Sequence, residues 1–276
     1  MSIRIADAAL LVLVICPWSS ACANVLPQRE QQRQASPEQQ GSFPGSVRAG
    51  VALGSFTHDV ALAVQLPGED DSVAELFQLG VEGGDTFGAG LNAEFTIAND
   101  ELRVFGPSTA GFEDTVVDVY PHFMVDLRGD RVRVPIRIGP LVHLVDEELT
   151  ASIGTVSLEM QSIGGRIGIE PAVDVLSSDD LTMTLYSGVG ASFAKTAIDV
   201  DTTVPGLGFV SGNFSTDMRG IALDVGARIA AGRFFGSLGY AYRNYDFDQS
   251  DPEGGLVVEA QEFTFHGVLV TLGLTW

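Results

Sequence analysis

The sequence predicts an all-β fold, an antiparallel up-and-down β-barrel of about ten strands, with eight or twelve strands as the alternatives. Three observations predict it. Apolar residues recur at every second position, the period of a β-strand, in one segment after another from Val47 to Trp276. The chain has 32 glycines and a mean hydropathy of +0.22, yet it lacks the run of about eighteen apolar residues that a spanning helix needs. The predicted connections alternate between short and long, as the two ends of a barrel do.

Residues 1–46 precede the predicted barrel. Residues 1–23 read as an export signal, with a short basic start, an apolar segment and a small-x-small cleavage site at Ala21-Cys22-Ala23. The same stretch resembles a lipoprotein box, in which Cys22 would be lipidated, so both forms of processing stay open. Residues 24–46 are rich in Gln, Pro and Glu and hold little to bury. We therefore expect a disordered leader there.

Cysteine usage and charge exclude several kinds of function. Both cysteines lie in the predicted signal, so the mature chain has no disulfide, thiolate metal site or catalytic thiol. The formal net charge is −21. Such a chain is not suited to nucleic acid, whose phosphates need a basic surface, and suits cations or basic partners instead.

The predicted barrel, residues 47–276, begins with a strand over 47–66. Its apolar phase switches after His58, which predicts a bulge near 58–59 or two separate strands. The second strand covers 73–81 and the third 87–97, with a tight turn at 83–85 between them.

The fourth and fifth strands, 117–127 and 132–142, form the clearest hairpin. One face is apolar over about ten positions on each strand, the length that crosses a bilayer when tilted, while the other face is charged. Closing the hairpin on Gly129-Asp130 predicts the pairs Leu127/Val132, Asp126/Arg133 and His122/Arg137.

Five further strands complete the wall. They are predicted over 163–175, 181–193, 221–229, 234–242 and 260–276. Short turns then lie at 83–85, 128–131, 177–180 and 231–233, while longer, acidic and irregular loops lie near 67–72, 98–115, 146–154, 200–216 and 246–260. The alternation makes the strand count even and places both ends of the barrel on the short-turn side.

The last strand carries a resemblance. Val268, Val270, Leu272, Leu274 and the terminal Trp276 form an alternating apolar row that ends on an aromatic residue. This resembles the C-terminal signal of Gram-negative outer-membrane β-barrel proteins, a general superfamily of porin-like barrels and barrels like the OmpA membrane domain. The resemblance implies a transmembrane barrel in the outer membrane, surrounded by lipid and lipopolysaccharide, with this strand read by the barrel assembly machinery. An ordinary terminal edge strand and a soluble lipocalin-like barrel are the alternatives.

Charged residues of both signs fall on the inward positions of the predicted strands. Charges of both signs favour a closed interior in which they neutralise one another, and a polar pore is the alternative. The Asp126/Arg133 and His122/Arg137 pairs would belong to the gate of such a pore. The residues predicted to line the interior are Glu94, Asp118, His122, Asp126, Arg133, Arg137, Arg166, Glu170, Asp174, Asp224, Arg228 and Arg243.

The sequence offers little for catalysis. The acidic pairs Asp199/Asp201 and Asp246/Asp248 suit the rim of an outer-membrane protease, but no Asp-x-His or His-x-Ser accompanies them, and His266 falls on the lipid-facing row. No cofactor or bound metal is expected. Acidic loops at 68–71, 146–148 and 246–253 form either a solvated rim or a collector of divalent cations. A porin-like or structural barrel is the leading function, with a surface interaction protein and a lipid- or peptide-modifying enzyme as alternatives.

Overall fold

The structure of the chain is a computed structural model that describes residues 45–59, 72–105, 108–151, 154–178, 180–204, 208–250 and 258–276. The predicted export signal, the leader up to residue 44 and the acidic segment 68–71 lie outside these residues. Within them, no helix combines the length and the apolar character that a membrane span requires.

All regular structure in the described residues is β. The strands are β1 (Gly45–Asp59), β2 (Ser72–Gly84), β3 (Phe87–Phe105), β4 (Ser108–Arg128), β5 (Val132–Ala151), β6 (Gly154–Ile169), β7 (Ala172–Ser177), β8 (Thr182–Val204), β9 (Gly208–Ala231), β10 (Phe234–Phe247) and β11 (Gln261–Thr275).

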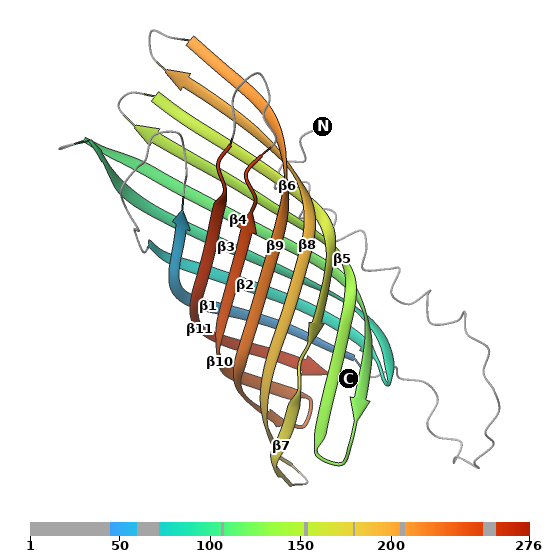
Figure 1. The fold of residues 1–276 in the computed structure, drawn as a ribbon. Coiled ribbons are helices and arrows are strands. Elements are labelled where there is room, and N and C mark those ends of the chain that lie inside the picture. The colour runs from blue at the N-terminus through green and yellow to red at the C-terminus, as the bar shows by residue number, and fades with distance from the viewer. Residues whose placement is uncertain are drawn as a thin grey trace.

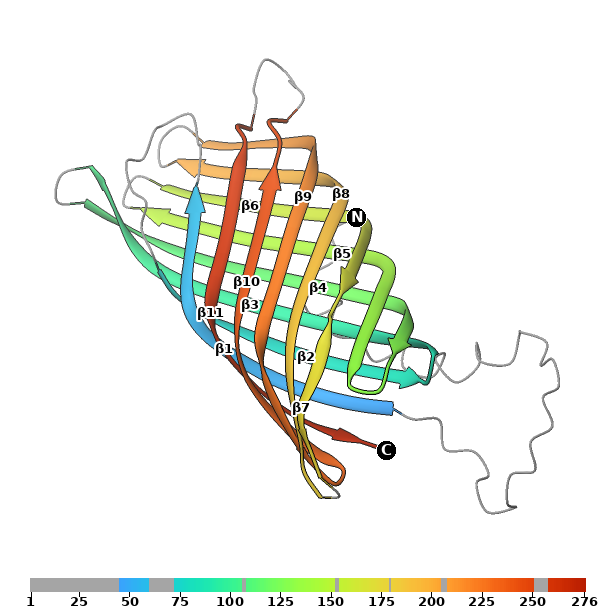
Figure 2. The same ribbon diagram turned by 60° about the horizontal axis from the view of Figure 1, so that its bottom comes forward.

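The strands close into a barrel of ten antiparallel wall positions (Figures 1 and 2). Strands adjacent in sequence pair with each other, except β6 and β7, and β1 pairs with β11 to complete the ring. β7 continues the position of β6 between β5 and β8. The two separate at Glu170-Pro171, where Pro171 has no amide hydrogen to donate to a ladder. The predicted all-β, antiparallel up-and-down fold is confirmed.

The closing seam between β1 and β11 is regular. Its pairing runs without a register shift from Ser46/Thr275 to Asp59/Glu262, and Gly45 and Trp276 exchange two backbone hydrogen bonds just beyond it. The described part of the first predicted strand therefore holds no bulge, and the strand ends at Asp59. Residues 60–66 lie outside the description.

Four tight connections lie at one end of the barrel, at the predicted places. β2 joins β3 through Gly84, whose φ of 124° favours glycine, and β9 joins β10 through Gly232, whose φ is 58°. The hairpin of β4 and β5 differs from the prediction in register. Leu127 pairs with Val134 and Asp126 with Pro135, two residues away from the predicted partners. A shift of two preserves the face of every side chain.

At the other end, three of the predicted long loops are wrong. Residues 98–105 and 108–115, 146–151, 200–204 and 208–216 belong to strands, so β3–β4, β5–β6 and β8–β9 are long hairpins. The fifth loop agrees with the prediction where it is described, because β10 ends at Phe247 and β11 begins at Gln261.

An apolar belt surrounds the half of the barrel next to the tight turns. Large apolar side chains on every strand face outward and are exposed, among them Val51, Leu79, Phe87, Phe123, Ile138, Ile163, Val175, Phe193, Val225, Leu238 and Leu272. We call these residues and their outward neighbours the apolar belt. An exposed apolar surface that encircles a protein is typical of contact with lipid.

Beyond the belt the polarity of the wall is inverted. On β5 the outward row passes from Ile138 to exposed Asp146 and Glu148, while the inward row passes from Arg137 to Val145, which is 2% exposed. A wall that faces lipid puts its apolar side out, and a wall that faces water puts its apolar side in. This inversion explains why the acidic outer segments are strands although their alternation differs from that of the belt.

The same inversion occurs on other strands and fills the barrel with an apolar plug. On β8, outward Val189 and Phe193 give way to exposed Asp199 and Asp201. On β1, Phe56 already points inward and is 3% exposed, which accounts for the switch of phase near His58. The apolar plug consists of Phe56, Leu76, Val145, Met160, Ile198, Met218, Phe247, Phe263 and Phe265, all nearly inaccessible to solvent.

Candidate functional site

The interior of the belted half is a stack of ion pairs, arranged from the tight-turn end upward. Nearest that end, the buried carboxylate of Asp126 accepts hydrogen bonds from Arg128 at 2.7 Å and from Arg133 at 2.8 Å. Arg128 also reaches Asp85 at the turn. The predicted Asp126/Arg133 pair therefore exists, although the two residues are not cross-strand partners.

The next level is centred on Glu82 of β2. Arg137 donates to both oxygens of Glu82, at 2.6 and 3.2 Å, and to Glu170 at 3.1 Å. His122 Nε2 lies 3.3 Å from the same Glu82 carboxylate. The predicted His122/Arg137 pair is thus wrong as a direct pair, since both side chains are held by an acid that the prediction left out. The cross-strand partner of Arg137 is Met124.

A third level holds Arg243, which is 2% exposed. Its guanidinium binds Glu94 through two hydrogen bonds of 2.7 and 2.8 Å and Asp224 through two of 3.0 and 3.2 Å. It also donates to the carbonyls of Leu223 and Tyr242. The arginine links β10 with β9 and, across the barrel, with β3.

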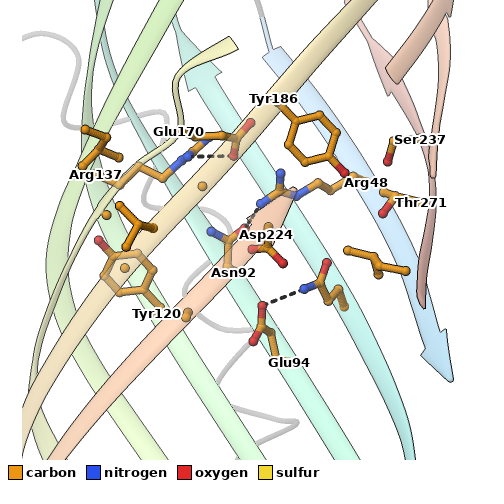
Figure 3. Close-up of a pocket in the computed structure, with 18 of the residues that line it drawn as sticks. Arg48, Asn92, Glu94, Tyr120, Arg137, Glu170, Tyr186, Asp224, Ser237 and Thr271 are labelled. Atoms are coloured by element: carbon orange, nitrogen blue, oxygen red, sulfur yellow. Dashed lines mark hydrogen bonds and ion pairs between the residues drawn. The ribbon is translucent and has the colours of Figure 1, made fainter. Parts of the chain in front are cut away.

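Between these levels lies a small polar cavity of about 90 Å³ (Figure 3). Arg48 donates to Asn92 there at 3.2 Å, and Gln78 donates to Glu94 at 2.8 Å. Arg166 lies over the ring of Tyr120, with 5.4 Å from Cζ to the ring centroid. The cavity has room for a few water molecules and is closed around by arginines and carboxylates.

Above the cavity, Asp118 joins two aromatic residues. His143 Nδ1 lies 2.7 Å from Asp118 Oδ1, and the Tyr245 hydroxyl donates to the other oxygen. Asp118 and His143 are almost fully buried. Their level adjoins the apolar plug, because the His143 ring contacts Phe247.

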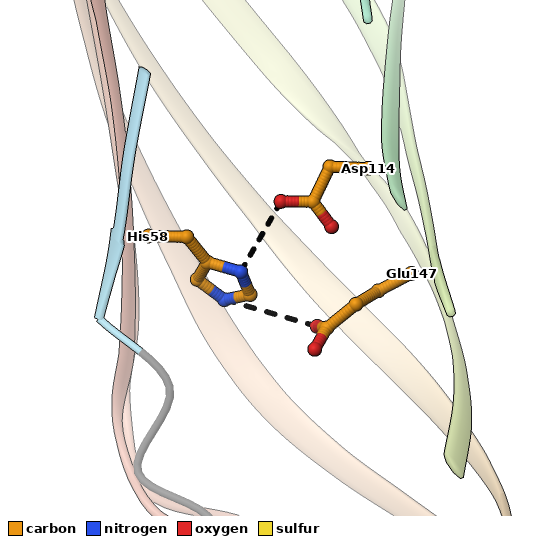
Figure 4. A group of neighbouring side chains, drawn as sticks. All are labelled: His58, Asp114 and Glu147. Carbon is orange, nitrogen blue, oxygen red and sulfur yellow. Dashed lines mark ion pairs between the residues drawn. The ribbon is translucent and has the colours of Figure 1, made fainter. Parts of the chain in front are cut away.

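The uppermost cluster stands within the plug, beyond the belt, and consists of His58, Asp114 and Glu147 from β1, β4 and β5 (Figure 4). His58 Nδ1 lies 3.2 Å from Asp114 Oδ2, and His58 Nε2 lies 3.8 Å from Glu147 Oε2. Phe263 stacks on the imidazole with 3.9 Å between ring centroids. Burial raises the pKa of Asp114 well above its ordinary value, and the charge of Asp146 raises it further. Burial also raises the pKa of Glu147 to about 7, although His58 opposes the shift.

All twelve residues predicted to line the interior make contacts inside the barrel. Besides the pairs above, Glu170 lies 3.5 Å from Arg228, Asp174 accepts from Thr184, and Arg228 lies over the ring of Tyr186. The prediction left out Arg48, Glu82, His143 and Tyr245 on the inward rows, and His58, Asp114 and Glu147 above them. Arg48 and Glu82 lie at the alternate positions of β1 and β2 that face inward, so the alternation of these two strands could have identified them as interior residues.

The residues considered for catalysis or assembly point outward. Asp199, Asp201 and Asp246 are exposed on the outer face of the wall, away from the interior, and Asp248 accepts from Arg219. His266 is on the outward row, near the ring of Tyr240. Val268, Val270, Leu272, Leu274 and Trp276 are each between 41% and 68% exposed and form part of the apolar belt.

No family model matches the chain, and no curated protein matches it by sequence. Solved structures match its fold. The outer membrane protease OmpT from Escherichia coli aligns over 86% of this chain and 99% of its own, at 10% identity and a TM-score of 0.54. The transport unit of the autotransporter AIDA-I from Escherichia coli aligns over 96% and 97%, at 9% identity and a TM-score of 0.42. The translocator domain of the autotransporter NalP from Neisseria meningitidis aligns over 97% and 96%, at 9% identity and a TM-score of 0.40. The chain has the fold of outer-membrane β-barrel proteins.

Proposed function

We propose that this protein resides in the outer membrane as a barrel with a closed interior, and that it acts at the cell surface through the water-facing part of its wall. The apolar belt supports the location, because an encircling apolar surface next to short turns suits a bilayer with those turns on the periplasmic side. A leader before β1 and the alternating terminal strand are consistent with export and assembly by the barrel assembly machinery.

The observation that carries the closed interior is the combination of ion-pair levels and apolar plug. A solute crossing the barrel would have to break hydrogen-bonded charge pairs such as Arg243 with Glu94, and then separate packed rings such as Phe263 and Phe265. Buried charges left without partners are costly, and so is a cavity opened in a packed core. A structural barrel therefore fits the interior better than a porin.

The surface role rests on the wall beyond the belt. Exposed carboxylates face each other across neighbouring strands there, with Glu113 opposite Glu148, and Glu159 between Asp146 and Asp199. We call these residues and Asp201 the acidic wall. Like charges in direct opposition repel, and a cationic partner would relieve that repulsion. We infer that the partner is basic, or is anionic lipopolysaccharide bridged by divalent cations.

Planar-bilayer recording of the refolded protein tests the closed interior. We expect no current above that of the bare bilayer, because the apolar plug blocks passage. The double variant Phe263→Ala and Phe265→Ala serves as the comparison, since it thins the plug and is expected to leak. A steady current through the unaltered protein would contradict the proposal and favour a porin-like function.

Binding of a cationic probe tests the surface role. Polylysine should bind neutral-lipid vesicles that carry the barrel, and high salt should weaken the binding. Neutralising Glu113, Glu148 and Asp199 as amides should reduce it at least severalfold, whereas Glu75→Gln, within the belt, should not. Equal binding by both variants would exclude the acidic wall as the contact surface.

A further inference from the structure

The cluster of His58, Asp114 and Glu147 differs from every ion-pair level below it. Those levels each contain an arginine or, at Asp118, a hydroxyl donor, so their carboxylates are neutralised or hydrogen-bonded. In the upper cluster, two carboxylates meet one imidazole, and within the described residues neither acid forms an ion pair with an arginine or a lysine.

The carboxyl groups of Asp114 and Glu147 are buried, and some of their oxygens accept no hydrogen bond. Asp114 is 0% exposed and Glu147 is 4% exposed. Within the described part of the chain, neither Oδ1 of Asp114 nor Oε2 of Glu147 accepts a hydrogen bond. A buried carboxylate oxygen without a donor loses its hydration and gains nothing in return, which is unfavourable unless a proton or a cation occupies the site.

The donor atoms converge. One nitrogen of His58 and one oxygen of each acid lie within 4.8 Å of one another. Ligand atoms around a tetrahedral ion with bonds of about 2.0–2.1 Å are separated by roughly 3.4 Å, so small side-chain rotations bring the three into range. Figure 4 shows both carboxylates on the side of the imidazole away from β1, with Asp114 joined to one ring nitrogen and Glu147 to the other.

A ring contact holds the imidazole in place. Phe263 stacks on one face of His58, with 3.9 Å between the ring centroids, and fixes the plane of the imidazole.

We propose that His58, Asp114 and Glu147 form a binding site for a divalent first-row transition metal, with Zn²⁺ as its representative. An imidazole with two carboxylates suits Zn²⁺ better than Ca²⁺ or Mg²⁺, which prefer oxygen ligands throughout. The metal would tie β1 to β4 and β5 across the barrel and supply the charge that the two acids need. The site does not depend on whether the interior conducts.

Calorimetric titration with Zn²⁺ tests the site. The full barrel, without an affinity tag and stripped by a chelator, is refolded into detergent micelles, and its folding is verified by heat-modifiable gel mobility. We expect one equivalent to bind with micromolar or tighter affinity, and Ca²⁺ to bind at least tenfold more weakly. Asp114→Asn and Glu147→Gln should each lower the Zn²⁺ affinity tenfold or more.

Glu75→Gln is the matched control, because it makes the same chemical change on the outer face of β2, away from the cluster and from the acidic wall. It should leave the Zn²⁺ affinity unchanged. The proposal is overturned if the folded, unaltered barrel releases no heat with Zn²⁺, or if the two cluster variants bind as tightly as the control.

X-ray absorption at the zinc edge keeps the test decisive if a cluster variant fails to fold. The unaltered protein with one equivalent of Zn²⁺ should show the scattering of a single imidazole. A coordination shell without imidazole would show that the Zn²⁺ ion binds elsewhere, and it would overturn the proposed site.

Discussion

Single residues in the interior differ widely in what they contribute. Arg243 makes six hydrogen bonds to Glu94, Asp224 and two carbonyls and is nearly inaccessible. Lys195 pairs with Asp217 at 2.5 Å, but its side chain is 82% exposed. Water and salt screen the Lys195/Asp217 pair, but they do not screen the buried contacts of Arg243.

Arg243→Leu should therefore destabilise the folded barrel strongly. The change leaves the partly buried carboxylates of Glu94 and Asp224 facing each other without the cation that binds both, which costs up to about 3–5 kcal/mol. Urea unfolding in micelles, followed by gel mobility, measures the loss. Lys195→Ala is the comparison and should shift the midpoint little; equal shifts in the two variants would contradict the assignment of Arg243 as the central cation.

Glu147 predicts how stability depends on pH. Burial raises its pKa to about 7, with His58 opposing the shift and Asp114 adding to it, whereas an unfolded glutamate titrates near about 4.3. Between these values the folded state holds a proton that the unfolded state has lost. The stability due to this group is therefore fully present below about pH 4 and is lost as pH rises through about 7.

Glu147→Gln should flatten that dependence, since an amide does not titrate. In metal-free buffer, unfolding between pH 5 and 8 should show the unaltered protein losing stability by a few kcal/mol relative to the variant. The outward Glu148→Gln should keep the slope of the unaltered protein. Parallel slopes for all three proteins would show that Glu147 is not protonated in the folded state.

At the scale of elements, the inversion of polarity along β4, β5, β6 and β8 decides how the strands behave. Near its tight turn each strand has the outward apolar row of a membrane strand, and near its other end it has the inward apolar row of a soluble strand. In the proposed position in the membrane, the outer segments have no lipid to cover them, so their stability comes from the apolar plug within. Their outward rows are free to carry charge, and there the like charges lie in direct opposition.

Glu159→Gln should stabilise the outer hairpins, because Glu159 stands between Asp146 and Asp199. We expect a gain of up to about 1 kcal/mol at low salt that shrinks at high salt. Glu75→Gln is the matched control, since Glu75 lies opposite Leu53 and Ile97. Hydrogen exchange of β6 and β8 amides reports the gain, and a gain that salt does not change would exclude repulsion as its cause.

The same inversion sets the limit of what the sequence predicts. The prediction applies one alternation, apolar outward, along each strand, and this alternation locates the belt and the ten wall positions. It fails where Val145, Ile198 and Phe263 are apolar on the inner face, and it therefore assigns the acidic segments around them to loops. The charged interior was predictable because a register shift of two leaves Asp126 and Arg133 on one face.

Contacts across the barrel were not predictable from strand patterns. Glu82 holds His122 and Arg137 together from β2, which no hairpin pairing indicates. Asp114 and Glu147 are cross-strand partners in the β4–β5 ladder, but His58 comes from β1, which pairs with neither of those strands. Their convergence depends on the diameter and shear of the closed barrel.

For the molecule as a whole, closure depends on the seam between β1 and β11. Trp276 follows the last strand, exchanges two backbone hydrogen bonds with Gly45, and is 52% exposed as a residue. The residue is therefore accessible from outside the barrel, while the seam itself is held by the backbone.

Trp276→Ala should slow membrane insertion in cells and leave the permeability of the inserted barrel unchanged. Both seam hydrogen bonds are backbone bonds and survive the change. The rate at which heat-modifiable barrel appears after a labelling pulse measures insertion, and bilayer recording measures permeability. Leu238→Ala removes another exposed belt side chain as a control; insertion of Trp276→Ala at the rate of this control would count against an assembly signal.

The level at which the polarity of the wall inverts also fixes how deep the protein can sit. If the barrel slid inward, the carboxylates of the acidic wall would enter hydrocarbon, and if it slid outward, rings at the outer edge of the belt such as Phe193 would leave it. The length of the strands sets neither the inward nor the outward limit of this movement. The belt and the acidic wall together fix the position of the barrel along the membrane normal. A bilayer of a different thickness would therefore have to deform to match the height of the apolar belt.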